Sequence, residues 1–212
     1  MLNLHYYPNT LSLVPHMVLE ETRLPYKLVL VDRRGPRTKA YLKLNPEGKV
    51  PTVTDGSQVI TETMAILMTI ADKSGKLAPK VGTKRRADWY RWSAFVGDTV
   101  KEAVFRFFRI GREEKNAKVR KQKQEVARKQ LDDLWQAVDR HLSAGGPYLL
   151  GKSVTTPDFH LHLMELWDPD PKRLAATFRH VGKHMERMAA RPAVKRVVAQ
   201  HAKERAELQA TA

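Results

Sequence analysis

Residues 44–65, LNPEGKVPTVTDGSQVITETMA, concentrate the residue types best suited to binding a small charged ligand. Asn45–Gly48 has turn composition, because proline presets one backbone position and glycine accepts positive φ. Val50-Pro51 then opens a strand, where proline cannot pair fully and where an X-Pro bond can be cis. Glu62 and Thr63 follow at an expected helix start. These groups predict a site for a ligand carrying an ammonium group and a carboxylate; the alternative is an ordinary hairpin before a capped helix.

Short alternating segments predict the elements that hold this stretch in place. Residues 52–54 and 58–60 flank Asp55-Gly56 and predict a hairpin, followed by a helix that begins at Thr61 or Glu62. Upstream, residues 2–6 and 26–32 read as strands on either side of a helix that Pro25 ends. With a short helix at 40–44, the order is β-α-β-α-β-β-α, and the opening β-α-β unit implies a parallel strand pair.

The second half of the chain is helical in its periodicity. A linker at 75–83, rich in glycine, proline and lysine, separates it from the first half. Apolar residues recurring at threes and fours predict helices at about 84–112, 116–143, 155–167 and 172–189, with a last one from 191. Thr155 and Asp158 have the spacing of a capping box, which assigns them a structural role.

Composition limits the class of protein. The chain has 212 residues, 42% of them apolar, and no cysteine, so disulfides, a thiolate nucleophile and cysteine-ligated metals are excluded. No long apolar segment predicts a membrane span, the N-terminus lacks signal-peptide character, and a cytoplasmic location is expected. His180 and His184 are four residues apart, but no third ligand accompanies them, so no metal site is predicted.

The formal charge of +15 raises the question of an anionic partner. The excess is uneven: residues 1–80 carry 11 Lys and Arg against 7 Asp and Glu, and residues 81–212 carry 27 against 16. The basic run at 109–129 also contains three glutamates in a helical pattern, which favours a solvated helix face. Nucleic acid is therefore not the expected partner.

The loop NPEGKVP followed by Glu62-Thr63 resembles the N-P-x-G-x-V-P loop and acid-hydroxyl pair of cytosolic glutathione transferases, particularly bacterial-type members. The capping box of Thr155 and Asp158 is a second family signature, and the resemblance spans about residues 2–200. It implies a thioredoxin-like α/β N-terminal domain (1–77) and an all-α C-terminal domain (84–212). It also implies a homodimer, for which the helix near Met64 and Met68 and the one near Trp89 are candidate surfaces.

The resemblance further implies a glutathione site and no metal cofactor. In the family, the residue before the cis-proline pairs with the cysteinyl unit through its main chain, and the acid-hydroxyl pair holds the γ-glutamyl end. Two lysines are placed near the glycyl carboxylate, although each could equally be a solvated side chain. The implied binding residues are Lys39, Lys49, Val50, Pro51, Glu62 and Thr63.

The same resemblance makes Ser12 the candidate catalytic residue. A hydroxyl at the first helix, aided by the helix dipole, favours the thiolate of a bound thiol. Related bacterial members carry a cysteine where this chain has Leu11, and a histidine of their fourth helix aligns with Asp98 here. The alternative for Ser12 is a plain helix N-cap.

Two functions remain open at this stage. One is a transferase that adds the glutathione thiolate to a small electrophile, with conjugation, isomerase, dehalogenase and peroxidase variants not separated. The other is a noncatalytic binding protein of the same fold whose basic helical half meets an acidic partner or nucleic acid. The motif at Val50-Pro51 and Glu62-Thr63 favours the first, whereas Leu11, Asp98 and the net charge favour the second.

Overall fold

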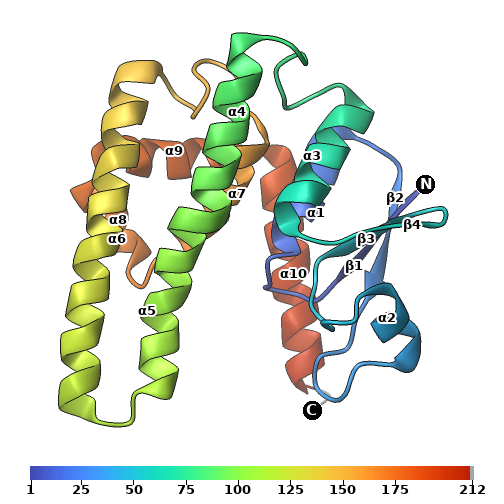
Figure 1. The fold of residues 1–212 in the computed structure, drawn as a ribbon, viewed down its shortest axis with the longest axis horizontal. Helices are drawn as coiled ribbons and strands as arrows, with labels where there is room; N and C mark the ends of the chain where they lie inside the picture. Colours follow the sequence, from blue (N-terminus) through green and yellow to red (C-terminus); the bar gives the residue numbers. More distant parts are fainter. Residues whose placement is uncertain (211–212) are drawn as a thin grey trace. The chain divides into compact units, whose positions relative to one another are not determined.

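The computed structural model describes residues 1–210 and divides the chain into two compact units (Figure 1). The first comprises residues 1–78 together with the segment that starts at Ala189, and the second is Pro79–Met188. The end of the chain therefore folds with its beginning. The predicted domains, 1–77 and 84–212, divide the chain in sequence order, whereas the two units are defined by contacts within the fold. The predicted domain boundaries remain a prediction.

A four-stranded mixed sheet forms the centre of the first unit. Its strands are β1 (Leu2–Tyr6), β2 (Tyr26–Leu30), β3 (Thr52–Asp55) and β4 (Gln58–Ile60), in the order β2-β1-β3-β4. β1 and β2 are parallel, as the β-α-β order predicts, and β3 and β4 form the predicted antiparallel hairpin.

Four helices belong to this unit: α1 (Leu13–Thr22), α2 (Lys39–Leu44), α3 (Thr63–Ser74) and α10 (Pro192–Ala210). The apolar residues of α1 lie on all its faces, and Val14, Met17 and Leu19 are fully buried. Such a helix needs cover all round. Figure 1 shows α10 running alongside α1, so the last helix supplies part of that cover.

The helices that lie wholly or mainly in the second unit are α4 (Lys84–Ala94), α5 (Lys101–Glu113), α6 (Ala117–Gly145), α7 (Thr156–Leu166), α8 (Pro171–Thr177) and α9 (Arg179–Ala190). A π-helical segment, η1 (Phe95–Val100), joins α4 to α5. α7 is the centre of this unit, because every residue from Thr156 to Glu165 is buried. Among the helices of residues 1–210, none combines the length and the apolar character needed to cross a membrane.

The prediction of one helix at 172–189 was wrong, because the chain breaks between α8 and α9 at Phe178. The Asp139 carboxylate on α6 accepts hydrogen bonds from the main-chain N–H groups of His180 and Val181, at 2.6 and 3.0 Å. This carboxylate caps the start of α9 from a neighbouring helix. A cap supplied from 41 residues away leaves no local sequence signal.

Candidate functional site

Strand register brings the predicted ligand-binding residues to one edge of the sheet. β3 pairs with β1 through His5 and Thr52, and with β4 through Val53 and Ile60. Continuing both registers past the strand ends places Val50-Pro51 opposite the end of β1 and the start of α3. The chain segments on which the prediction depends therefore meet where β1 ends, β3 begins and β4 ends.

The turn before β3 is fixed by two side chains. The Asn45 amide donates to the Lys49 carbonyl oxygen at 2.9 Å and to Thr52 Oγ1 at 3.1 Å. The buried Tyr41 hydroxyl donates to the same carbonyl at 2.5 Å. These bonds hold the main chain on both sides of Val50-Pro51, whose peptide bond is cis. Within residues 1–210, the main-chain N–H and C=O of Val50 have no hydrogen-bond partner, so both can meet a ligand.

Glu62 occupies an uncommon backbone position at the start of α3. Its φ is 64° and its ψ is 122°, a region that non-glycine residues rarely adopt. The side chain is exposed, makes no capping bond and, among the described residues, has no hydrogen-bonding or ionic partner. Thr63, the first residue of the helix, is buried. The edge thus presents a free carboxylate beside the N–H groups of a helix N-terminus.

The two predicted lysines lie on either side of the turn at Asn45–Gly48. Lys39 is exposed at the start of α2. Lys49 is exposed and its Nζ lies 2.6 Å from Glu47 Oε2. Hydrogen bonding to Glu47 and its charge raise the pKa of Lys49, and the charge of Glu62 acts in the same direction. Lys49 therefore stays a cation at the edge that carries Glu62.

Ser12 lies in a closed turn before α1. It is fully buried, and its Oγ accepts from the Tyr7 N–H at 3.3 Å. The same atom lies 3.0 Å from the Tyr7 carbonyl oxygen, to which it donates, and 2.7 Å from Thr10 Oγ1. Its side chain makes no capping bond to α1. A role on a ligand's sulfur would require Ser12 to give up one of these contacts.

The main chain of the same turn offers a donor that the sequence did not single out. Within the described part of the chain, the Leu11 N–H has no hydrogen-bond partner, and the residue is partly exposed. The N–H groups of Leu13 and Val14 are paired with the Thr10 and Leu11 carbonyls. The turn thus presents a main-chain donor at Leu11, the position that the sequence resemblance aligns with a cysteine. Asp98 lies in the second unit, exposed within η1.

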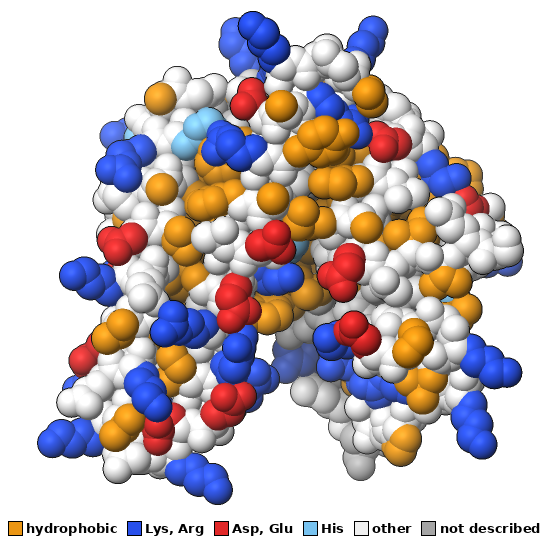
Figure 2. All heavy atoms as spheres, viewed as in Figure 1, with side chains coloured by type: hydrophobic (Ala, Val, Ile, Leu, Met, Phe, Trp, Pro, Cys, Tyr) orange, Lys and Arg blue, Asp and Glu red, His pale blue; other side chains and the backbone are white. Residues whose placement is uncertain are grey.

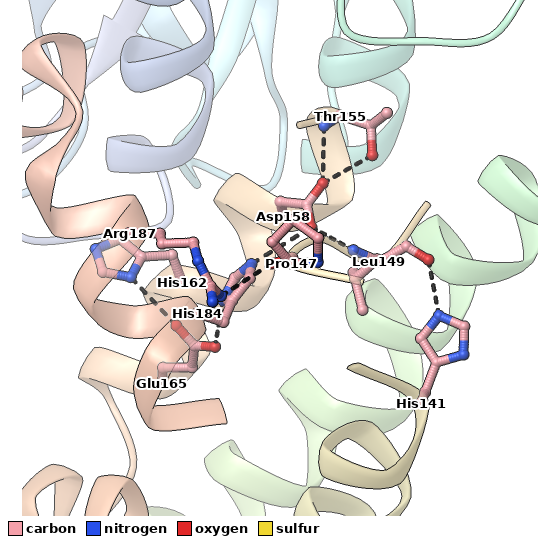
Figure 3. Close-up of polar contacts among 9 residues, drawn as sticks. All are labelled: His141, Pro147, Leu149, Thr155, Asp158, His162, Glu165, His184 and Arg187. Atoms are coloured by element: carbon pink, nitrogen blue, oxygen red, sulfur yellow. Dashed lines mark hydrogen bonds and ion pairs between the residues drawn. The ribbon is translucent and has the colours of Figure 1, made fainter. Parts of the chain in front are cut away.

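The capping box of α7 is part of a larger buried network, drawn in Figure 3. Thr155 donates to Asp158 Oδ2 through its N–H at 2.7 Å and through its hydroxyl at 2.8 Å. The other carboxylate oxygen, Oδ1, accepts from the Leu149 N–H at 2.8 Å and lies 3.3 Å from His184 Nε2. The Nδ1 atom of His184 lies 2.7 Å from Glu165 Oε1. One imidazole therefore bridges two buried carboxylates (Figure 3).

The charge of His184 follows from these neighbours. Burial opposes its protonation, but the Glu165 charge and the hydrogen bonds to Asp158 and Glu165 outweigh burial and raise its pKa to about 10. Within residues 1–210, no group of three or more His, Cys, Asp or Glu side chains has the arrangement to hold a metal ion. The network is a buried ion cluster that joins α7 to α9.

Comparison with known proteins identifies the family. The model of the glutathione S-transferase N-terminal domain matches residues 11–73, and that of the C-terminal domain matches residues 100–201. A glutathione S-transferase of Xanthomonas campestris pv. campestris is 31% identical over 172 residues, covering 78% of this chain and 82% of that protein. The chain belongs to the glutathione S-transferase family.

Further glutathione S-transferases extend the likeness over nearly the whole chain. The enzyme GstA of Escherichia coli O157:H7 is 27% identical and covers 91% of this chain and 95% of its own length. A glutathione transferase structure from Methylococcus capsulatus is 30% identical with a TM-score of 0.80, covering 95% of this chain and 99% of that one. A sphingomonad glutathione S-transferase in complex with glutathione is 28% identical with a TM-score of 0.80, covering 94% and 98%. The predicted transferase fold is confirmed.

Proposed function

We propose that this family member binds glutathione at the β1, β3 and α3 edge and transfers its thiolate to a small electrophile. The observation that carries the proposal is Glu62, whose carboxylate makes no hydrogen bond or salt bridge among the described residues and whose backbone has a rare conformation at a helix N-terminus. Rare conformations of this kind cost free energy and are concentrated at functional sites. The relatives support the proposal, since they are glutathione S-transferases and one of them is in complex with glutathione.

Each part of glutathione has a chemically suited partner at this edge. The γ-glutamyl ammonium suits the free Glu62 carboxylate, and its carboxylate suits Thr63 with the N–H groups of α3. The N–H and C=O of Val50, both without partners among the described residues, suit the cysteinyl main chain, and cis-Pro51 follows them. The exposed Lys39 and Lys49 suit the glycyl carboxylate.

With glutathione bound in this way, its sulfur lies at the turn before α1. The helix N-terminus and the free Leu11 N–H stabilise a thiolate over a thiol, and the released proton goes to water. A Ser12 hydroxyl that turns from Tyr7 would add a second donor. The thiolate forms the new S–C bond with an electrophile, which either loses a leaving group or takes up a proton from solvent. Such a mechanism needs no cysteine and no metal from the protein.

We propose a homodimer with glutathione and a small electrophile as its ligands.

The alternative function, binding of nucleic acid or an acidic partner, finds little support on the surface. Figure 2 shows Lys and Arg side chains spread over the face in view with acidic side chains between them, rather than gathered in one patch. In the basic run, Lys123 pairs with Glu114 and Arg109 with Glu102. These pairs are typical of a solvated surface.

The proposed function is tested by retention on immobilised glutathione, followed by conjugation assays with aryl halides, epoxides and activated alkenes. The expected result is elution by free glutathione and turnover with at least one electrophile class. The outcome that would refute the proposal is no retention and no turnover in a folded protein. Tight binding to DNA or RNA at physiological salt would favour the alternative.

A further inference from the structure

The last helix reaches the turn at which the sulfur is proposed to lie. The Asn9 N–H donates to His201 Nδ1 at 3.4 Å, across 192 residues of sequence. The Tyr6 hydroxyl, just before the turn, donates to Glu204 Oε2 at 3.0 Å. Both contacts lie within the first compact unit, in which α10 packs along α1 (Figure 1).

His201 continues this contact into a chain of hydrogen bonds. Its Nε2 lies 2.9 Å from His16 Nδ1, and His16 Nε2 lies 2.8 Å from the Tyr26 hydroxyl. That hydroxyl donates to Glu20 Oε1 at 2.7 Å, and Glu20 pairs with Arg196 on α10. This chain of hydrogen bonds therefore starts at the Asn9 turn and ends on α10, the helix that carries His201.

The two ends of this chain fix its direction. The Asn9 N–H can only donate, so His201 Nδ1 must accept and its Nε2 must carry the hydrogen. His16 then accepts at Nδ1 and donates from Nε2 to Tyr26, which donates to the Glu20 carboxylate. Each ring has one tautomer that satisfies both of its neighbours. Burial lowers the pKa of His201 to about 4. Burial, together with electrostatic repulsion between the two rings, lowers the pKa of His16 to about 3. Both rings are therefore neutral at pH 7.

Asn9 is a sensitive point in the turn. Its φ is 55°, in the left-handed region, and its side chain is exposed. Asparagine tolerates this region better than most other residues, but the contacts around it still fix the position of the turn. The bond to His201 is the contact from α10 that does so, and the free N–H of Leu11 follows two residues later. The orientation of that donor therefore depends on the anchored Asn9.

We propose that His201 is a positioning residue, which holds the Asn9 turn so that the Leu11 N–H and the α1 N-terminus face the glutathione sulfur. This inference rests on the proposed function and deepens it. His201 itself does not touch the ligand. Its loss moves the donors at the sulfur but leaves Glu62, Thr63 and Val50 in place, since those residues are held by the turn of Asn45 and by α3.

The test compares His201→Leu, His201→Gln and the control Ala202→Leu, which adds the same side chain at the neighbouring exposed position. In His201→Leu, we expect glutathione affinity to change by less than about twofold, and the pKa of the bound thiol to rise by about one unit. Turnover at neutral pH should then fall about tenfold and recover at high pH. Glutamine has both an acceptor and a donor and should restore most of the turnover. The control should match the parent.

Three results would overturn the inference. The first is a His201→Leu variant whose thiol pKa and pH profile equal those of the parent. The second is a glutamine variant no better than the leucine variant while both remain folded. The third needs no variant: an Asn9 amide that exchanges with solvent as fast as a free amide is not held by His201. A folded parent that does not bind glutathione would refute the proposed function, and the positioning role with it.

Discussion

At the scale of single residues, the side-chain contacts of Ser12 differ most from those that its sequence position predicts. Its Oγ contacts both main-chain groups of Tyr7 and Thr10 Oγ1. We predict that Ser12→Ala lowers the free energy of unfolding by about 1–3 kcal/mol, because the Tyr7 N–H loses its partner in a partly buried turn. Denaturant unfolding measures this, with the exposed turn residue in Ser57→Ala as the control. An equally stable Ser12→Ala variant would contradict the role of the hydroxyl in the turn.

The same variant decides whether Ser12 also acts on the sulfur. If it does, kcat falls at neutral pH and recovers at higher pH, where solvent removes the thiol proton without help. If Ser12 only holds the turn and the Leu11 N–H keeps its place, the pH profile of kcat stays that of the parent. Conjugation rate and thiolate absorbance against pH separate the two results.

Local sequence predicted the place of the candidate binding residues in the fold better than the contacts of the candidate catalytic residue. Glu62, Val50 and Pro51 lie in a motif whose turn and proline determine their own backbone, so their place at the sheet edge could be predicted. The orientation of Ser12 depends on Thr10 and on the main chain of Tyr7, and that of Asn9 on a histidine 192 residues away. The contact of Asn9 is set by tertiary packing and has no local signal. The partners of Ser12 are two and five residues away, in a turn whose closure the apolar pattern does not reveal.

At the scale of secondary-structure elements, the contact between α7 and α9 depends on His184. Removing this cation leaves the carboxylates of Asp158 and Glu165 buried without their shared partner. We predict that His184→Ala costs about 3–5 kcal/mol of unfolding free energy, the range for a broken buried ion pair. His180→Ala, on the same helix but with a partly exposed ring, is the control and should cost much less. Equal stability losses would contradict the prediction.

Periodicity predicted most helices, and its errors have physical causes. Apolar spacing places α4 to α7 correctly, because those helices bury one or more faces. It did not predict the π-helical turns of η1, in which the apolar pattern continues through Val96 and Val100. It also missed the break at Phe178, where Asp139 of another helix supplies the cap.

At the scale of the whole molecule, the buried histidines predict sensitivity to acid. His16 and His201 have pKa values lowered to about 3 and about 4, against an ordinary value of 6.5 in the unfolded chain. Between these values the unfolded chain binds more protons, so stability falls as pH falls below 6.5. The slope is at most about 1.4 kcal/mol per pH unit for each ring. Thermal unfolding from pH 7 to pH 4 measures it, and the slope should shrink in a folded His201→Gln variant.

Association into a homodimer is the second prediction at this scale. The indole of Trp89 is fully buried and cannot form a contact surface, whereas its neighbour Tyr90 is 45% exposed on α4. We expect a dimer at micromolar concentration that Tyr90→Glu weakens, because a charge on an apolar contact must be desolvated. Sedimentation velocity measures both, and a stable parent monomer would contradict the prediction.

Titration calorimetry with glutathione tests the central claim most directly. The parent chain should bind one glutathione per chain. Glu62→Ala should weaken binding by about 1.5–3 kcal/mol, the range for a hydrogen bond to a charged group, because the ligand ammonium is left unpaired. Glu125→Ala, at an exposed carboxylate on α6, is the matched control and should bind like the parent. No binding by the folded parent, or equal affinity in Glu62→Ala, would contradict the account.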